Sequence, residues 1–168
     1  MSSLDLIIFS LFFFPFCALA LSWLAGTDAP YVPTKMKNIN KVLKFARVRK
    51  GKKFYELGSG DGRVVYEAAS MGADAVGIEQ SILRVWYSAL KARNLNLPNT
   101  KFIHGNVFNK NYSDANIIYI YLLTKGVKKL EEKLTKELKK KTIIITQTYH
   151  FQKLKPYKKI GDFNFYRI

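Results

Sequence analysis

Glycine occupies every second position of residues 58–62, and this glycine run lies between two segments of different periodicity. Residues 53–57 form a short, largely apolar segment typical of a strand, whereas residues 63–71 carry apolar side chains at helical spacing. Glycine permits a tight turn and a close approach of the backbone to a ligand. A strand, a glycine loop and a helix in this order predict the first unit of a parallel sheet, with a ligand at the carboxyl ends of its strands.

The alternation of strand and helix continues along the chain. Further strands are predicted at 75–79, 101–104, 116–121 and 142–148, a closing hairpin at 155–160 and 163–168, and further helices at 38–49, 81–94 and 125–140. Strands that alternate with helices pair in parallel through right-handed crossovers, which predicts an α/β fold with a doubly wound, Rossmann-like sheet. The length of 168 residues corresponds to one such domain.

An apolar segment precedes this domain. Residues 6–24 contain five phenylalanines and are interrupted only by two serines and one proline. A helix of about 20 apolar residues spans a bilayer, and Trp23 suits the membrane interface. The sequence therefore predicts a transmembrane anchor at residues 1–26 and the α/β domain at residues 27–168. A cleaved signal peptide is the alternative, because Ala18-Leu19-Ala20 resembles a cleavage site, although the positively charged start of such peptides is absent.

Basic residues flank the apolar segment on one side. Nine lysines and arginines lie between Thr27 and Lys53, and none precedes residue 6. The positive-inside rule then predicts a single-pass membrane protein whose α/β domain lies on the cytoplasmic side. The same basic residues can also rest on anionic lipid headgroups.

The charge of the whole chain restricts its partners only weakly. A formal net charge of +16 attracts nucleic acid, anionic lipid or acidic protein surfaces. Most of the basic residues are lysines, however, and a genome biased toward AT codons also produces this composition. The charged segment 125–141 is interpreted as the solvated face of an amphipathic helix, with partner binding as the alternative. One cysteine, Cys17, and two histidines predict neither a disulfide within the chain nor a metal site.

The glycine run itself narrows the choice of ligand. A dinucleotide site has the spacing G-x-G-x-x-G, whereas here Arg63 follows G-x-G-x-G, and a phosphate loop would need Gly-Lys-Ser/Thr. Glu56 precedes the run, and its carboxylate would repel a pyrophosphate but can accept hydrogen bonds from an ammonium group. S-adenosylmethionine has an ammonium group and no phosphate, so it is the predicted ligand.

Two further strand ends support this prediction. Glu79 closes the second predicted strand, 17 residues after Gly62, where an acidic side chain can hold ribose hydroxyls. Asn106 follows the third predicted strand and is placed to meet the edge of an adenine ring.

Together these features resemble class I S-adenosylmethionine-dependent methyltransferases. A narrower resemblance is to the mitochondrial lysine methyltransferases that modify the ATP synthase c-ring protein and the adenine nucleotide translocase, with their archaeal protein-lysine methyltransferase relatives. It is carried by the segments at 30–34 (PYVPT), 56–65 (ELGSGDGRVV), 79–80 (EQ), 85–88 (VWYS) and 121–123 (YLL). The chain departs from the family where Asn106 replaces the more usual Asp, and it matches poorly after Thr148.

The resemblance implies roles for individual residues. The implied cofactor contacts are Thr34, Glu56, Gly58, Ser59, Gly60, Asp61, Gly62, Glu79, Gln80, Asn106 and Val107. The implied acceptor is a protein lysine, which must be neutral to react, and a membrane protein is the expected substrate because an anchor raises the effective concentration at the surface. Tyr121 is the catalytic candidate near the transferred methyl group. Candidate walls of an aromatic lysine channel are Tyr31, Tyr119, Tyr121, Tyr149 and Phe151.

Three other functions remain as alternatives. The charge favours an RNA methyltransferase, although the Asp/Asn-Pro-Pro-Tyr/Phe segment of base-amino methyltransferases is replaced here by residues 119–123 (YIYLL). The anchor favours a methyltransferase that acts on a quinone or lipid. A domain that binds S-adenosylmethionine without turnover is the third alternative.

Overall fold

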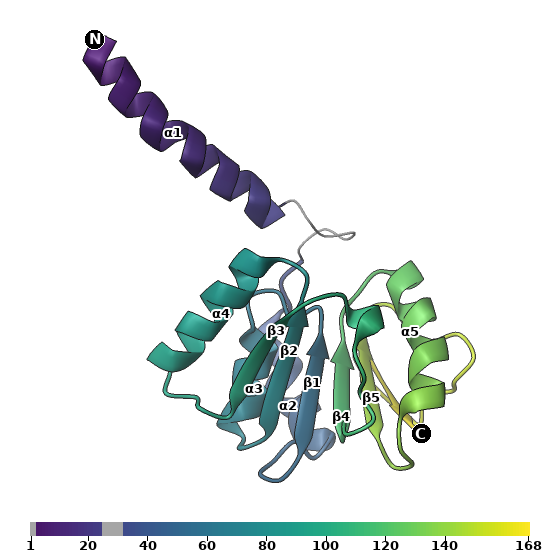
Figure 1. The fold of residues 1–168 in the computed structure, drawn as a ribbon. Coiled ribbons are helices and arrows are strands. Elements are labelled where there is room, and N and C mark those ends of the chain that lie inside the picture. The colour runs from purple at the N-terminus through teal and green to yellow at the C-terminus, as the bar shows by residue number, and fades with distance from the viewer. Residues whose placement is uncertain (1–2, 25–31) are drawn as a thin grey trace.

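The structure, a computed structural model, describes residues 3–24 and 32–168 and contains a seven-stranded sheet with helices on both faces (Figure 1). The order of strands is β3-β2-β1-β4-β5-β7-β6. The strands are β1 (Lys53–Leu57), β2 (Asp74–Glu79), β3 (Thr100–His104), β4 (Ile117–Ile120), β5 (Ile143–Gln147), β6 (Lys158–Ile160) and β7 (Phe163–Arg167). The helices are α1 (Ser3–Leu24), α2 (Ile39–Phe45), α3 (Arg63–Ser70), α4 (Ile82–Asn94) and α5 (Thr124–Glu137), with short 3-10 turns η1 (Met36–Asn38) and η2 (Val107–Asn109). The predicted doubly wound α/β fold is confirmed.

The direction of the strands places a crevice at the centre of the sheet. β1 to β5 are parallel, whereas β7 pairs antiparallel with both β5 and β6, as the predicted closing hairpin requires. From β1 the chain proceeds outward to β3 and then returns to β4 on the other side of β1. The order therefore reverses between β1 and β4, and ligands of open α/β sheets bind at the carboxyl ends of the strands beside such a reversal.

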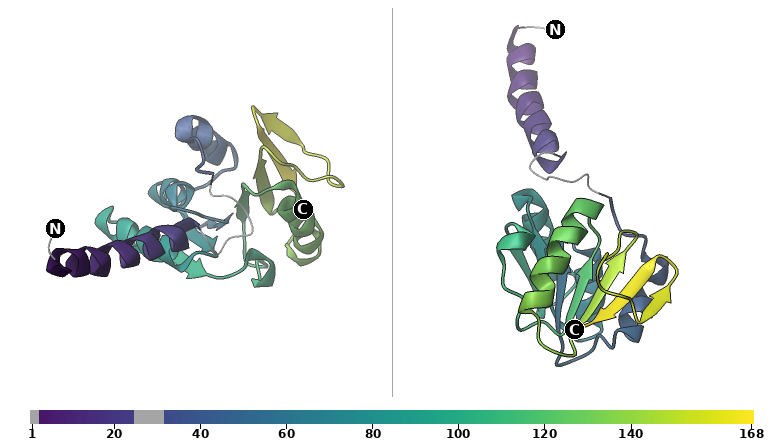
Figure 2. Two further views of the ribbon diagram at one scale, coloured as in Figure 1. Left: turned by 90° about the horizontal axis from the view of Figure 1, so that it is seen from above. Right: turned by 90° about the vertical axis from the view of Figure 1, so that its right-hand side faces the viewer.

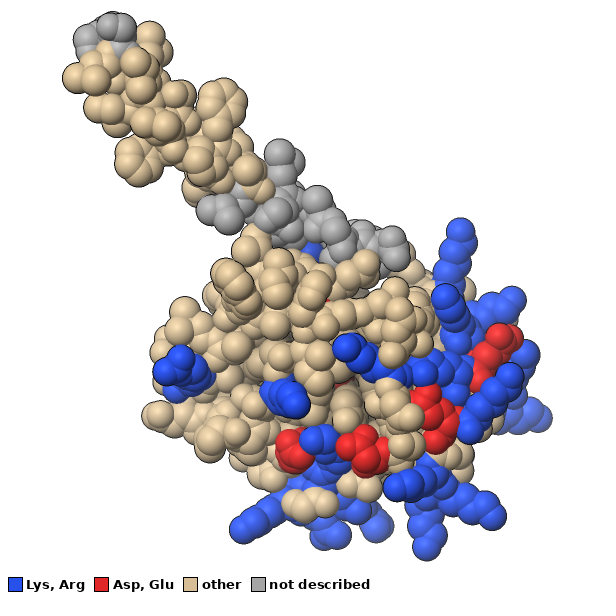
Figure 3. Space-filling view, in the orientation of Figure 1, with Lys and Arg blue, Asp and Glu red and all other residues tan. Residues whose placement is uncertain are grey.

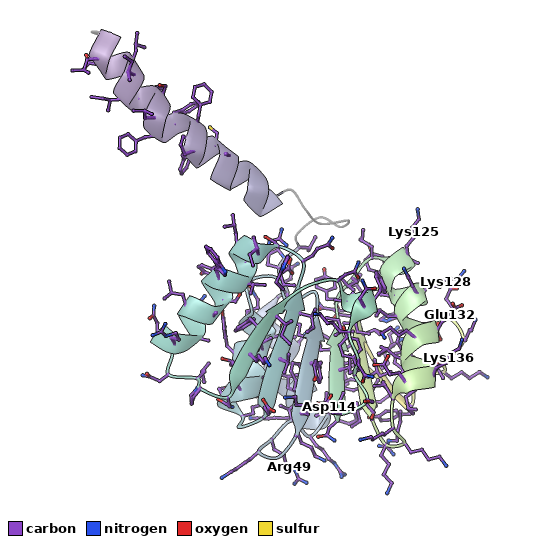
Figure 4. All side chains as sticks on the ribbon, in the orientation of Figure 1. Arg49, Asp114, Lys125, Lys128, Glu132 and Lys136 are labelled. Atoms are coloured by element: carbon purple, nitrogen blue, oxygen red, sulfur yellow. The ribbon has the colours of Figure 1, made fainter. Side chains whose placement is uncertain are left out.

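Two apolar clusters fill the space between sheet and helices. One buries α2 and α3 against the sheet, with Phe54, Tyr119 and Phe165 in the same cluster. The other buries α5 against the opposite face, where Leu130 and Leu134 contact the sheet. Lys125, Lys128, Glu132 and Lys136 lie on the exposed side of α5 and point away from the sheet (Figure 4), as predicted for the charged segment.

Two helices end earlier than the sequence predicted. The helix predicted to reach residue 49 ends at Phe45, because Arg47 adopts a left-handed conformation (φ 61°) and the amide of Val48 donates back to the Leu43 carbonyl at 3.0 Å. The helix predicted to reach residue 140 ends at Glu137, and Leu138 is extended and buried.

The N-terminal helix α1 extends away from the sheet domain (Figures 1 and 2). It includes Pro15, and its large apolar side chains from Leu4 to Phe16 are exposed. In residues 3–24 and 32–168, no helix combines the length and the apolar character that a membrane crossing requires. The predicted domain boundary between residues 26 and 27 lies outside the described residues.

Candidate cofactor and acceptor site

The glycine run forms the loop between β1 and α3. The amides of Gly58 and Ser59 both donate to the Ile78 carbonyl of β2 at 2.9 Å, so the loop is attached to the neighbouring strand. Gly58 has a φ of +82°, and a Cβ atom there would lie 2.8 Å from the Leu122 side chain. Only glycine adopts this conformation readily and leaves this space. The Ser59 hydroxyl is buried and, within residues 3–24 and 32–168, has no hydrogen-bond partner.

Glu56 is a buried carboxyl group at the base of this loop. Its Oε2 atom accepts a hydrogen bond from the Val65 amide at 3.2 Å, and the sheet register places it beside Tyr119 of β4. Burial, followed by the negative charge of Asp61, raises the pKa of Glu56 well above its ordinary value. A cationic ligand group would offset both effects. The buried carboxyl and the unsatisfied Ser59 hydroxyl therefore fit a ligand that, like S-adenosylmethionine, carries an ammonium group and further polar atoms.

Glu79 lies at the end of β2 and faces the same loop. Its Oε2 atom accepts from the Gly60 amide at 2.9 Å, and its Oε1 atom accepts from the Ser81 amide at 2.9 Å and from Arg84 Nη1 at 3.0 Å. A carboxylate offers about four acceptor positions, so about one remains for a ribose hydroxyl. If Glu79 is to accept hydrogen bonds from both ribose hydroxyls, one of these three contacts must break.

The N-terminal linker is tied to the loop through Arg63. Arg63 forms an ion pair with Asp61 at 2.5 Å, and its Nη1 atom donates to the carbonyl oxygen of Thr34 at 3.2 Å. Thr34 is buried, and its side chain lowers the pKa of Tyr119, opposing the larger effect of burial. The structure thus brings Thr34 to the cofactor loop, as the sequence predicted. Gly62 caps α3 in a left-handed conformation with a φ of +78°.

The remaining predicted cofactor contacts follow β2 and β3. Gln80 is exposed, and its carbonyl oxygen is 2.8 Å from His104 Nε2. Asn106 uses its side-chain oxygen to cap η2, where it accepts from the Phe108 amide at 2.9 Å, which leaves its amide NH2 group as a donor for a ligand. Val107, the first residue of η2, is half-buried.

At the acceptor end, Tyr121 follows β4 directly and is half-buried against the cluster of α2 and α3. Tyr119, two residues earlier on the same face, is fully buried and donates a hydrogen bond to Gln147 Oε1. Burial raises the pKa of Tyr119 well above its ordinary value. Gln147 Nε2 in turn donates to Asp162 at 3.1 Å.

Of the other aromatic candidates, Phe151 lies apart from this pair. Phe151 is buried against Tyr166 in the cluster under α5, on the opposite face of the sheet, so its predicted role as a channel wall is wrong. The chain turns at Thr148, directly after β5, where this residue adopts a left-handed conformation (φ 61°), and Phe151 follows this turn. Tyr149 is exposed, and Tyr31 lies outside the described residues.

Sequence reasoning missed two residues that organise the site. Arg84 holds Glu79, and no spacing rule links an arginine on a helix to an acid five residues earlier. Glu131 of α5 is buried and accepts hydrogen bonds from the amides of Gln152, Lys153 and Leu154 at 2.9, 2.8 and 2.7 Å, so it fixes the loop after β5. Its position in a charged helix suggested a solvated side chain.

The parallel sheet, the glycine loop at the reversal and the two acidic strand ends define a class I S-adenosylmethionine-dependent methyltransferase domain. Residues 56–158 match the sequence profile of the ANTKMT methyltransferase domain, and the chain belongs to this family. The sequence-based resemblance, the enzyme class and S-adenosylmethionine as cofactor are thereby confirmed, whereas the individual cofactor contacts stay predictions.

Curated relatives agree with this assignment. The chain is 33% identical over 123 residues to a human lysine N-methyltransferase of the ATP synthase C subunit, covering 73% of this chain and 52% of the relative. It is 32% identical over 130 residues to a protein-lysine N-methyltransferase of Saccharolobus islandicus, covering 76% of this chain and 81% of the relative. The chain therefore spans about half the length of the human relative and most of the archaeal one.

Among solved structures, an RNA methyltransferase from Salinibacter ruber in complex with S-adenosyl-L-homocysteine matches with a TM-score of 0.74 and 28% identity. The match covers 81% of this chain and 92% of the other. It is a complex of this fold with the demethylated product of the cofactor.

Proposed function

We propose that this protein is a protein-lysine N-methyltransferase that is attached to a membrane through α1. The observation that carries the proposal is the position of Tyr119 beside the buried carboxyl of Glu56 at the cofactor loop, with Tyr121 half-buried directly after the same strand. The printed names of the human and archaeal relatives support a lysine acceptor.

The cofactor supplies the methyl group, and the protein supplies position and electrostatics. Glu56 and the loop amides would bind and orient the cofactor next to β4. The acceptor lysine must be neutral, and its ordinary pKa is about 10.4. Desolvation in a partly buried channel disfavours the ammonium form and lowers that pKa. We propose that Tyr121, half-buried after β4, forms part of the wall around the acceptor nitrogen. Alignment of the methyl donor and the acceptor can lower the activation free energy by roughly 7–11 kcal/mol.

An RNA acceptor is the second candidate, since the Salinibacter ruber relative is described as an RNA methyltransferase. Lysines and arginines also gather along the lower edge of the molecule and over α5 (Figure 3). Residues 119–123, at the end of β4 and directly after it, contain no Pro-Pro pair, which disfavours a base-amino acceptor.

The two candidates separate in one labelling experiment. The full chain and its Glu56→Gln variant are incubated with tritiated S-adenosylmethionine and with membrane and soluble extracts. Parallel samples are treated with protease or RNase, and labelled residues are mapped by mass spectrometry. We expect protease-sensitive label on lysine that the variant loses. Label that RNase removes would replace the lysine acceptor with RNA, and label soluble in organic solvent would indicate a quinone or lipid.

Membrane attachment is proposed from the character of α1. Its described side chains from Leu4 to Phe16 are almost all apolar and lie on all sides of the helix, and such helices are buried in protein or in lipid. The basic residues between Thr27 and Lys53 favour a position of the methyltransferase domain on the cytoplasmic side of the membrane. We expect the full chain to resist carbonate extraction from membranes and the domain to be digested by protease added to that side. Release by carbonate would contradict the attachment.

A further inference from the structure

The outer face of α4 is apolar where a surface helix is normally polar. Ile82, Trp86 and Leu90 follow each other at intervals of four residues, and Tyr87 lies beside them. Trp86 is 68% exposed and Leu90 is 59% exposed. These four side chains are called here the α4 outer face. A cluster of large, exposed apolar side chains is typical of a surface that contacts another molecule or a membrane.

The α4 outer face lies on the side of the helix that points away from its own domain. The opposite side of the same helix buries Val85, Ser88 and Ala92, and Tyr66 of α3 donates to the Ser88 carbonyl at 3.0 Å. The helix is thus packed against its own domain through this side, whereas Ile82, Trp86 and Leu90 are exposed on the other.

Two observations indicate lipid as the partner of this face. The backbones of α1 and α4 approach within 8 Å of each other, so α4 lies beside the helix that is proposed to attach the protein to the membrane. In the view of Figure 3 the surface over the upper part of α4, next to α1, is mostly uncharged, whereas Lys and Arg gather along the lower edge and over α5.

The residue types agree with the interfacial layer of a bilayer. Trp and Tyr have an apolar ring and a polar group, and both favour the level of the lipid headgroups. The charged residues of α4 outside its buried side are Lys91 and Arg93 in the last turn, and long basic side chains there can extend to lipid phosphates.

We propose that the α4 outer face rests in the interfacial layer of a phospholipid bilayer. This second contact, together with α1, fixes the orientation of the domain on the membrane. Ile82 lies three residues after Glu79, so the carboxyl ends of the strands, and with them the cofactor site, come next to the lipid surface. The acceptor groups within reach are then those of membrane proteins close to the bilayer. The inference rests on the membrane attachment proposed above.

The two tryptophans of the chain allow a direct test. The full chain with Trp23→Phe retains Trp86 as its one tryptophan, and the matched variant Trp86→Phe retains Trp23. Both are reconstituted into vesicles of phosphatidylcholine with a minor fraction of phosphatidylglycerol, with or without bromine on the upper acyl chain. We expect brominated lipid to quench most of the Trp86 fluorescence. In vesicles without bromine, we expect the Trp86 emission to shift to the blue and to be protected from quenching by iodide.

Every other result overturns the inference in an identifiable way. If brominated lipid quenches Trp23 while iodide quenches Trp86, α1 is attached and α4 faces water. If brominated lipid quenches neither tryptophan, the membrane attachment fails as well. If Trp86 is protected from iodide but is not quenched by brominated lipid, protein covers the α4 outer face.

Discussion

Arg84 Nη1 donates to Glu79 Oε1 at 3.0 Å, and the two side chains are only 3% and 5% exposed. The pair connects the first turn of α4 to the end of β2, and it aims the acidic side chain predicted to meet the ribose. A buried ion pair contributes little net stability when it is intact, but removal of one partner leaves an uncompensated buried charge.

Replacement of Arg84 by methionine should therefore lower the free energy of unfolding by about 3–5 kcal/mol and weaken binding of S-adenosylmethionine. Urea unfolding and calorimetric titration measure the two effects. Arg93→Met on the exposed side of the same helix is the matched control and should change stability by less than about 0.5 kcal/mol. Equal losses in the two variants would contradict the role of the Glu79–Arg84 pair.

Gly77 of β2 leaves space for the cofactor loop. A Cβ atom there would lie 2.7 Å from Ser59 Oγ and 2.9 Å from Phe102 Cδ1. Gly77→Ala should destabilise the fold by about 1–3 kcal/mol because the loop or the Phe102 ring must shift. Gly126→Ala is the control and should leave the free energy of unfolding unchanged or raise it. Its Cβ atom would make an ordinary 3.5 Å contact in α5, and alanine favours a helix by up to about 1 kcal/mol relative to glycine. Thermal unfolding of both variants decides, and a stable Gly77→Ala protein would show that the loop adapts.

The raised pKa of Glu56 predicts a pH dependence of cofactor binding. The ammonium group of S-adenosylmethionine favours the ionised carboxylate, so affinity should increase as pH rises from about 5 toward the pKa range of an α-amino group, about 7.7–8.0. In the Glu56→Gln variant binding should be weaker and its dependence on pH flatter. Calorimetric titration across this range tests both, and parallel pH profiles for the two proteins would exclude Glu56 as the ammonium partner.

The same pKa has a consequence for stability without ligand. Above the ordinary pKa of 4.5 the unfolded chain has lost the Glu56 proton while the folded protein still holds it. The folded state then binds more protons, so the contribution of Glu56 to stability decreases as pH rises through this window. Glu56→Gln should remove this part of the decrease, as measured by urea unfolding at several pH values.

Tyr121 and Tyr119 should respond differently to removal of the hydroxyl group. Tyr121→Phe should reduce kcat by about tenfold, or about 1.4 kcal/mol, with little change in cofactor affinity, because Tyr121 is assigned to the acceptor. Tyr119→Phe should lower stability by about 1–3 kcal/mol, since it leaves the buried Gln147 Oε1 atom without its donor. Steady-state kinetics and urea unfolding separate the two effects. A Tyr121→Phe enzyme with unchanged kcat would exclude its role at the acceptor.

The fold followed from local features of the chain. Apolar periodicity located all seven strands and the helices that alternate with them. The apolar repeats of strands and helices have different periods, so a segment of a few residues is enough to distinguish them. Glycines at 58, 60 and 62 marked the cofactor loop, and all three adopt positive φ angles. The end of α2 at Phe45 was missed, since a non-glycine residue, Arg47, makes the left-handed turn there.

The organisation of the site depended on contacts between distant segments. Phe151 was expected beside Tyr119, but the turn at Thr148 carries it to the opposite face of the sheet, where it packs on Tyr166. Glu131 was expected in solvent, yet three amides of the loop after β5 bind its carboxylate.

The sequence by itself therefore determined the succession of strands and helices along the chain, the glycine loop and the class of cofactor. These depend on periodicity and on backbone conformations that few residues adopt. Only the tertiary structure decided which side chains meet across elements, such as Glu79 with Arg84 and Tyr119 with Gln147. Such meetings depend on strand register and on helix rotation, and a change of one residue in either turns a side chain from the site to the opposite face.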